Sequence, residues 1–394
     1  MLAASVAAAA LVAAACSSSK DTAVSGGGAT TSAPAASTAT QPSSAGSPST
    51  AGSAPANVGT FGPVFDAAKG LTGSDREQRL VQLAKDEGNK MTLYTAGSKP
   101  LMDSLVAAFQ KKYGIKVDSY RADQLNITQR ITEESKAGRI GADVVYSVGN
   151  QMVVLSDAGM FVPYSPPGAD GLTPGSVRDD GWIADQELVY VVAWNKNLVK
   201  PGDAPKTYED LADDKWNGKI AIDVKDADWY YTIYNYWVKE EGKTPEEADA
   251  LFKKIFTGAT ATNGTTATDA LVAAGQYKVF ATDYWHTVNA SIAKGAPMAY
   301  LPAVQPVLAG PQGMALLKDA ANPAAAVLFA DWLVSEDGQQ AMLDSGSVPV
   351  LQSLIPDEYK KLKVVHIDVR DFQQNYDSWQ SKYSQLLQLA SKSK

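Results

Sequence analysis

The sequence predicts an α/β fold with two units, each a mainly parallel sheet flanked by helices. The first observation is a strand–helix–strand–helix–strand alternation from residue 90 to 148, which needs crossover connections and so implies parallel strands. A second alternation of this kind lies between about residues 187 and 300. The third observation is length, because about 330 residues follow a low-complexity N-terminus, enough for two ordinary domains.

The first unit has readable element ends. The stretch 73–88 predicts a helix in which Ser74 and Glu77 form a capping box and Gly88 follows the last turn. Strands are then expected at 90–95, 115–122 and 142–148, separated by helices at 101–114 and 126–141. In such sheets, ligands lie beyond the carboxyl ends of the strands.

The second unit has the same style. A long strand is expected within 185–199, followed by a helix, turn and strand over 205–223. Helices are predicted at 226–242, at 244–256 and from residue 263, with a strand at 277–284. Residues 310–343 return to a strand and two helices, and a polar helical tail begins at Asp357.

Charge and residue types exclude several function classes. The net charge of −8 spreads along the body, with no basic face of the kind that nucleic-acid binding needs. The one cysteine, Cys16, excludes an internal disulfide and a cysteine-based zinc cluster. No G-x-S-x-G, H-E-x-x-H or G-x-x-x-x-G-K-[ST] motif occurs, and His366, between apolar residues, is expected to be structural. We therefore predict that the chain is not an enzyme; a secreted hydrolase with two carboxylates is the least favoured alternative.

The N-terminus predicts export. Residues 1–15 form a short apolar run typical of a signal peptide, and "VAAAC" resembles a bacterial lipobox with Cys16 as the lipid-modified residue. An ordinary cleaved signal is the alternative. Residues 16–58 are mostly Ser, Ala, Gly, Thr and Pro and predict a disordered tether with a reach of about 35 Å. The expected location is the extracellular face of the cell membrane, with a lipid anchor at Cys16.

Four segments, in order, resemble extracellular solute-binding proteins of ABC importers, in the ferric-iron-type branch of the type II periplasmic binding protein fold. They are "LAKDEGNKMTLYTAGSKPLMDSLVAAFQKKYGIKV", "ADVVYSVGNQMVVLSDAGMFVPY", "APKTYEDLADDKWNGKIAI" and "NPAAAVLFADWLVSEDGQQAML". With their connections they cover nearly all of the body from about residue 75.

The resemblance implies two lobes joined by a two-strand hinge, with one ligand in the cleft between them. Lobe one would be 59–187 plus 301–352, and lobe two 188–300 plus 353–394. The hinge strands would bend near 184–189 and 297–303. The expected partners are a small-molecule solute and an ABC permease; the chain is expected to be a monomer that binds no nucleic acid and has no cofactor.

Small polar residues follow the predicted strands and begin the next helices. Hydrogen bonds to a ligand are expected from these residues: Thr95, Ser98, Ser147, Asn150, Asn263, Thr265 and Thr266. The alternative for Ser98 is that its hydroxyl only caps a helix.

The stretch "FATDYWHTV", residues 280–288, resembles the place where ferric-binding relatives carry two adjacent tyrosines. Tyr284 matches the first of them, and Trp285 stands where the second would be. An indole N–H only donates hydrogen bonds, so Trp285 cannot be an iron ligand. We therefore predict an aromatic wall of Trp285, Tyr284 and Trp229, with His286 beside it, and no metal site; if the ligand were iron, Tyr284 would bind it.

This mixture of groups favours a small polar organic solute with an anionic group, such as a phosphonate, sugar phosphate or carboxylate. Ferric iron or a ferric complex is the first alternative. An organic cation is another; it would use cation–π contacts and one or more of the candidate carboxylates Asp223, Asp226, Asp228 and Asp283. A ligand sensor for a membrane kinase would use the same lobes with a different partner.

Overall fold

The computed structural model describes residues 58–392. The predicted signal peptide, Cys16 and nearly all of the predicted tether lie outside this range and stay predictions. Within it, no helix is long and apolar enough to cross a membrane.

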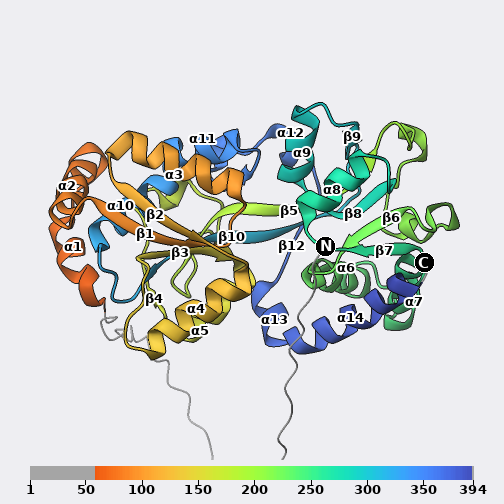
Figure 1. Ribbon diagram of the computed structural model, residues 1–394, viewed down its shortest axis with the longest axis horizontal. Coiled ribbons are helices and arrows are strands. Elements are labelled where there is room, and N and C mark those ends of the chain that lie inside the picture. Colours follow the sequence, from red (N-terminus) through yellow and green to blue (C-terminus); the bar gives the residue numbers. More distant parts are fainter. Residues whose placement is uncertain (1–57, 393–394) are drawn as a thin grey trace, which may run out of the picture. The chain divides into compact units, whose positions relative to one another are not determined.

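The strands of the described chain form one twelve-stranded mixed sheet (Figure 1). Its main path runs β2 (Lys116–Arg121), β1 (Lys90–Thr95), β3 (Val144–Val148), β10 (Val307–Leu317), β5 (Ile183–Asn195), β8 (Val279–Tyr284), β6 (Ile220–Asp223), β7 (Ala259–Thr262). Four short strands lie off this path: β4 (Phe161–Val162), β9 (Met298–Ala299), β11 (Val348–Pro349) and β12 (Val364–His366).

Strand direction divides this sheet into three parts. The strands β2, β1 and β3 are parallel to one another, and β8, β6 and β7 are parallel at the other end. Between them, β10 and β5 are antiparallel to each other, β10 is antiparallel to β3, and β5 is antiparallel to β8. The predicted parallel groups are thus confirmed, and two long antiparallel strands connect them.

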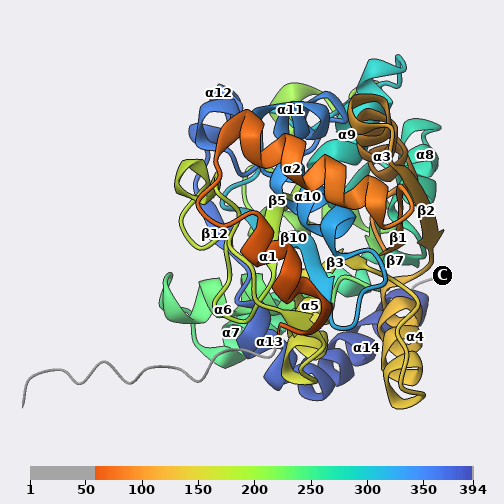
Figure 2. The ribbon, with the colours of Figure 1, turned by 90° about the vertical axis from the view of Figure 1, so that its left-hand side faces the viewer.

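Helices cover both faces of each parallel group (Figures 1 and 2). The first group carries α1 (Gly62–Ala67), α2 (Gly73–Asp86), α3 (Lys99–Tyr113), α4 (Gln124–Lys136), α5 (Gly149–Asp157), α10 (Pro323–Leu333) and α11 (Glu336–Asp344). The second carries α6 (Ala227–Lys239), α7 (Pro245–Thr257), α8 (Thr265–Ala273), α9 (Trp285–Ala293), α12 (Asp357–Lys360), α13 (Val369–Gln374) and α14 (Tyr376–Lys392). Short 3-10 turns join several of these elements: Gly59–Phe61, Ala169–Gly171, Pro201–Asp203, Glu209–Ala212, Asp214–Trp216 and Gln352–Leu354.

The buried apolar residues divide between the two ends of the sheet. Two clusters hold the residues of β1, β2 and β3 with their helices, and two others hold those of β6, β7 and β8 with theirs. The strand β10 contributes Leu308 and Ala309 to the second pair of clusters, and Met314 and Leu316 to the first. One strand therefore serves both cores, as a connecting strand between two lobes must.

The contact between β10 and β5 depends on a glycine. The register shifts between Gln312 and Gly313, and a Cβ at Gly313 would lie 1.9 Å from the carbonyl oxygen of Ile183. Only glycine permits this approach.

The second connecting strand, β10, begins at Val307. This start is later than the stretch 297–303 in which the sequence predicted it, where the structure has only the short strand β9.

The predicted capping box of the first long helix is wrong. Helix α2 begins at Gly73, and its N-cap position, Thr72, makes no capping hydrogen bond from its side chain. Ser74 therefore lies inside the first turn, where its hydroxyl cannot act as an N-cap. The described chain has a true capping box at α7, where Thr244 and Glu247 each bond the backbone N–H of the other.

The C-terminal helices contact helices of both parallel groups: α14 contacts α6 and α7, and α13 contacts α5. The ring of Trp379 on α14 packs against Tyr230, Tyr231 and Tyr234 of α6 at centroid distances of 5.2 to 5.6 Å. On α13, Arg370 pairs with Asp157 and Asp180 at 3.0 and 2.7 Å. Helix α14 also contacts β7, whereas α13 also packs against α14; the assignment of the tail to the second lobe stays a prediction.

Candidate functional site

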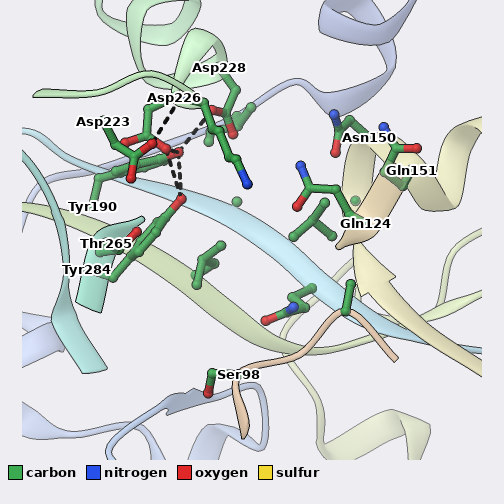
Figure 3. A pocket seen from close by; sticks show the side chains of 18 of the residues that line it. Ser98, Gln124, Asn150, Gln151, Tyr190, Asp223, Asp226, Asp228, Thr265 and Tyr284 are labelled. Atoms are coloured by element: carbon green, nitrogen blue, oxygen red, sulfur yellow. Dashed lines mark hydrogen bonds between the residues drawn. The ribbon is translucent and has the colours of Figure 1, made fainter. Parts of the chain in front are cut away.

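A pocket of about 690 Å³, with both polar and apolar side chains in its lining, lies where the carboxyl ends of the two parallel groups face each other (Figure 3). The ends of β1 and β3 and the starts of α4 and α5 contribute one wall, including Ser98, Gln124 and Asn150. The end of β6 and the starts of α6, α8 and α9 contribute the other, including Asp226 and Tyr284. The middle strands β5 and β10 form its base. Its volume is in the range of small-molecule sites.

The structure brings six of the predicted ligand-binding residues together on this pocket. They are Ser98, Asn150, Thr265, Thr266, Tyr284 and His286. The other five do not line it: Thr95, Ser147, Trp229, Asn263 and Trp285.

The two tryptophans of the predicted aromatic wall lie in the core. Trp285 is 4% exposed and packs edge-on against Tyr300 and Tyr359, because it opens α9 with its ring turned away from the pocket. Trp229 is fully buried between Tyr208 and Phe252. Their placement contradicts the tryptophan wall.

Three of the predicted polar residues also lie elsewhere. Thr95 is fully buried, and its hydroxyl accepts a hydrogen bond from the Gly97 backbone at 3.0 Å. Ser147 is fully buried inside β3, and its hydroxyl has no hydrogen-bond partner within the described chain. Asn263 is exposed in the turn before α8. The small polar residues of the sequence predicted the correct turns at the pocket. Thr95 and Ser147, however, lie at strand positions whose side chains point into the core.

Ser98 occupies the N-cap position of α3, but its hydroxyl makes no capping hydrogen bond. The side chain is half-buried and lines the pocket. The interpretation of Ser98 as a cap alone is therefore wrong, and its hydroxyl is available to a bound molecule.

Two helices begin on the pocket without a side-chain cap. Helix α5 starts after Val148 and helix α8 after Gly264, and neither N-cap residue supplies a capping oxygen. The close fit of Gly149 holds α5 in place, because a Cβ there would lie 2.9 Å from the carbonyl oxygen of Pro311. Asp223 holds the start of α8 by accepting the Gly264 N–H at 2.7 Å. Uncapped N–H groups at these two starts favour an anionic or polar ligand atom.

Two tyrosines and two aspartates form the acidic wall of the pocket (Figure 3). The hydroxyl of Tyr284 donates to that of Tyr190 at 2.8 Å. The Tyr190 hydroxyl lies 2.9 Å from Asp228 Oδ1 and 3.2 Å from Asp226 Oδ1. Asp226 is 4% exposed, and its Oδ2 atom has no hydrogen-bond partner within the described chain.

Burial sets the ionisation of this wall. Loss of solvation and repulsion from Asp223 and Asp228 raise the pKa of Asp226 well above its usual range. Burial and the nearby aspartates also raise the pKa values of Tyr190 and Tyr284. The tyrosines are therefore neutral hydrogen-bonding groups at physiological pH.

His286 lines the pocket beside Tyr284, with ring centroids 5.7 Å apart. Burial lowers the pKa of His286 to about 4. The imidazole is neutral at physiological pH, so it can exchange a hydrogen bond with a solute but cannot serve as the cationic partner of an anion.

Amide side chains line the opposite wall and the base, together with Arg121 and several apolar residues. Gln124, Asn150 and Gln151 lie together in Figure 3. At the base, Gln186 donates to Gln312 at 2.7 Å, which joins β5 and β10. Amides both donate and accept hydrogen bonds, so this wall suits a polar solute of either charge.

One ion pair spans the pocket. Lys225, in the turn after β6, contacts Asp123 at the N-cap of α4 at 2.9 Å. Burial and this lysine act on Asp123 in opposite directions, and its pKa is lowered overall. Lys225, which precedes Asp226 in the sequence, is therefore already paired with another carboxylate.

Sequence reasoning did not select Tyr190 as a site residue. It sits in "LVYVVAW", which reads as an apolar strand, and only its pairing with Tyr284 across β5 and β8 places its hydroxyl on the pocket. Asp226 and Asp228 were candidates only for a cationic ligand, and both line the pocket, whereas Asp283 does not. In the described chain, no group of three or more His, Cys, Asp or Glu residues could hold a metal ion.

Relatives of known name share part of this chain. The "Iron uptake protein A1" of Synechocystis is 27% identical over 173 residues, 43% of this chain and 46% of that protein. The "Fe(3+)-binding periplasmic protein" of Serratia marcescens is 27% identical over 193 residues, 48% of this chain and 55% of that protein. The chain thus aligns with only about half the length of these two relatives.

Solved structures share the fold. Iron-bound HitA from Pseudomonas aeruginosa has a TM-score of 0.60 at 20% identity, covering 77% of this chain and 99% of that one. AfuA from Actinobacillus pleuropneumoniae, with fructose-6-phosphate bound, has a TM-score of 0.65 at 20% identity, covering 76% and 99%. These are two-lobe periplasmic binding proteins, which confirms the predicted fold class.

The family model described as "Bacterial extracellular solute-binding protein" matches residues 104–365. The match covers well over half of the chain and spans the pocket-lining turns from Gln124 to Tyr284. The chain belongs to the bacterial extracellular solute-binding protein family.

Proposed function

We propose that this protein is the extracellular solute-binding component of an ABC importer, which captures a small polar organic solute with an anionic group and delivers it to a membrane permease. The observation that carries the proposal is the pocket itself. Its volume of about 690 Å³ fits a small organic molecule, and both parallel groups of the sheet contribute polar side chains to it.

The anionic group of the solute would lie between the starts of α5 and α8. Their uncapped N–H groups and helix dipoles favour negative charge. The side chains of Asn150 and Thr265 stand at these starts, and Ser98 adds a hydroxyl that caps nothing. The two starts come from opposite walls, so one anionic group between them would draw the walls together.

Closure by hinge bending would couple binding to delivery. The expected lobes are 59–187 plus 301–352 and 188–300 plus 353–394, and β5 and β10 supply the connecting strands. A solute that contacts both walls binds the closed form more tightly than the open one, and so shifts the population toward it. The permease would recognise the closed form.

Ferric iron is the second candidate function, and the acidic wall is the observation that favours it. Tyr284, Tyr190, Asp226 and Asp228 bring hard oxygen donors within 2.8 to 3.4 Å of one another. Against iron, Trp285 cannot replace a second adjacent tyrosine, and burial raises the pKa values of both phenols, which opposes phenolate formation. We therefore favour the organic solute.

A thermal-shift screen of the full chain carrying Cys16→Ser tests the proposal without the predicted lipid. The panel holds phosphonates, sugar phosphates, carboxylates, sulfate, ferric iron and ferric citrate. Stabilisation by one organic class supports the proposal, because a ligand at a thousand times its Kd adds about 4 kcal/mol. Stabilisation by free ferric iron alone would replace it with the iron candidate.

A further inference from the structure

Asp226 is the buried group of this pocket that its surroundings leave least satisfied. It is 4% exposed and lines the pocket at the N-cap of α6. The hydroxyls of Tyr190 and Tyr284 both approach its Oδ1 atom, at 3.2 and 3.4 Å, and the Thr282 hydroxyl also interacts with the carboxyl group and lowers its pKa. No donor of the described chain lies within hydrogen-bond distance of Oδ2. A buried carboxyl oxygen without a hydrogen-bond partner is costly, so its presence on a binding surface needs an explanation.

The charged neighbours of Asp226 do not supply that partner. The ammonium of Lys225, the adjacent residue, contacts Asp123 instead at 2.9 Å. Asp223 stabilises the local backbone, because its two oxygens accept hydrogen bonds from the backbone N–H groups of Lys225 and Gly264 at 3.1 and 2.7 Å. Asp228 adds a further carboxylate to the pocket, 2.9 Å from the Tyr190 hydroxyl. Two carboxylates thus face the pocket with no basic side chain of the described chain paired to either.

We infer that the solute carries an ammonium group, which binds Asp226 and Asp228 beside the rings of Tyr190 and Tyr284, in addition to the anionic group held at the starts of α5 and α8. This inference rests on the proposed function and narrows it to zwitterionic solutes. A primary ammonium has three donors, which match Asp226 Oδ2, an oxygen of Asp228 and a tyrosine hydroxyl. The ring faces add cation–π attraction.

The two subsites lie on different features of the pocket. The acidic wall belongs to β5, β8 and the start of α6. The uncapped start of α8 lies beside this wall, whereas the uncapped start of α5 lies on the opposite wall. The amides of Gln124 and Gln151 line the wall opposite the acidic one, near Asn150 at the start of α5, and can bond the middle of a solute. A solute whose anionic group contacts the start of α5 would therefore hold that group apart from an ammonium at the acidic wall.

Matched probe pairs that differ only by an amine test this inference on the full chain carrying Cys16→Ser. The pairs are 2-aminoethylphosphonate with ethylphosphonate, phosphoethanolamine with ethyl phosphate, and glucosamine 6-phosphate with glucose 6-phosphate, measured by calorimetry. The expected result is that at least one amine-bearing probe binds tenfold or more tightly than its partner. Equal affinity within every pair that binds would overturn the ammonium inference and leave the proposed function standing. No binding by any of the six, together with no stabilisation by any organic class in the thermal-shift screen, would overturn both.

Variants locate the ammonium subsite. Asp226→Asn keeps the shape and removes the ionisable carboxyl group that would pair with an ammonium, and should lower the affinity for the preferred amine-bearing probe at least tenfold while changing that of its amine-free partner less than threefold. Asp228→Asn is the second variant, in case Asp226→Asn does not fold. Asp118→Asn is the matched control, since this aspartate is paired with Lys116 at 2.6 Å and does not line the pocket. Equal losses for both members of a probe pair, or a larger loss in the control, would contradict the inference.

Discussion

Tyr190 and Tyr284 are direct cross-strand partners of β5 and β8, and the hydroxyl of Tyr284 donates to that of Tyr190 at 2.8 Å. Their ring centroids are 4.5 Å apart. The pair places two phenols against Asp226 and Asp228, so the pairing of two strands fixes the chemistry of one pocket wall.

Replacing Tyr190 by Phe should weaken solute binding about ten- to 150-fold. The ring and its packing stay, but Asp226 and Asp228 lose a shared donor, and a lost hydrogen bond to a charged group costs about 1.5–3 kcal/mol. Calorimetry with the best ligand of the screen measures the effect. The control is Tyr208→Phe. Tyr208 is buried away from the pocket, so this variant should bind the ligand as tightly as the wild-type protein. Unchanged binding in Tyr190→Phe would exclude the acidic wall from the site.

Replacing Trp285 by Ala should destabilise the fold by about 3–5 kcal/mol, as for other large buried aromatic residues. Its ring fills space between Tyr300 and Tyr359 and does not reach the pocket. Chemical denaturation measures the loss, and Trp285→Phe should lose clearly less. A stable Trp285→Ala protein with weakened binding would restore the aromatic-wall hypothesis.

Replacing Gly149 by Ala should weaken the binding of an anionic solute. The free energy lost from binding should exceed the free energy lost from folding. The new methyl group would meet the Pro311 carbonyl oxygen at 2.9 Å, which displaces the uncapped start of α5. Affinity for an anionic probe, measured beside the melting temperature, separates the two effects. Gly202→Ala is a suitable control, because a Cβ there meets nothing within 4 Å. Full affinity in Gly149→Ala would argue against an anion subsite at α5.

Acidification should destabilise the protein partly through His286. Burial lowers the pKa of His286 to about 4, below the ordinary value of 6.5. Between these two values the unfolded chain takes up a proton that the folded chain does not, so the contribution of His286 to stability falls as the pH drops from 6.5 toward 4. Above pH 6.5 it is constant.

Melting temperatures of wild type and His286→Gln across this pH range test the effect. The raised pKa values of Asp226 and Asp283 act in the opposite sense and are common to both proteins, so the difference between the proteins is the informative quantity. The variant should lose less stability on acidification. Parallel curves would show that His286 titrates normally.

Export and lipid attachment at Cys16 stay predictions of the sequence, and metabolic labelling checks them. A radiolabelled fatty acid should enter the wild-type chain in its native host and not the Cys16→Ser variant, which should be released into the medium. Labelling of neither protein, with release of both, would favour an ordinary cleaved signal.

Local sequence patterns predicted the fold more completely than they predicted the residues of the site. Alternation of strands and helices predicted both parallel groups, because each crossover helix is encoded within its own stretch of sequence. The side-chain directions of Thr95, Ser147 and Trp285 depend on one residue of strand alternation or helix phase, which those patterns do not fix. The position of Tyr190 on the pocket depends on a strand partner 94 residues away in sequence, and no local signal marks it.

The most direct test of the central claim is the melting temperature of the full Cys16→Ser chain with zwitterionic and anionic organic phosphates beside ferric iron and ferric citrate. We predict a rise of several degrees with one organic class and none with iron, since about 4 kcal/mol of added stability shifts a chain of this size by that amount. A rise with free ferric iron and none with any organic probe would contradict the account and assign Tyr190, Tyr284, Asp226 and Asp228 to a metal.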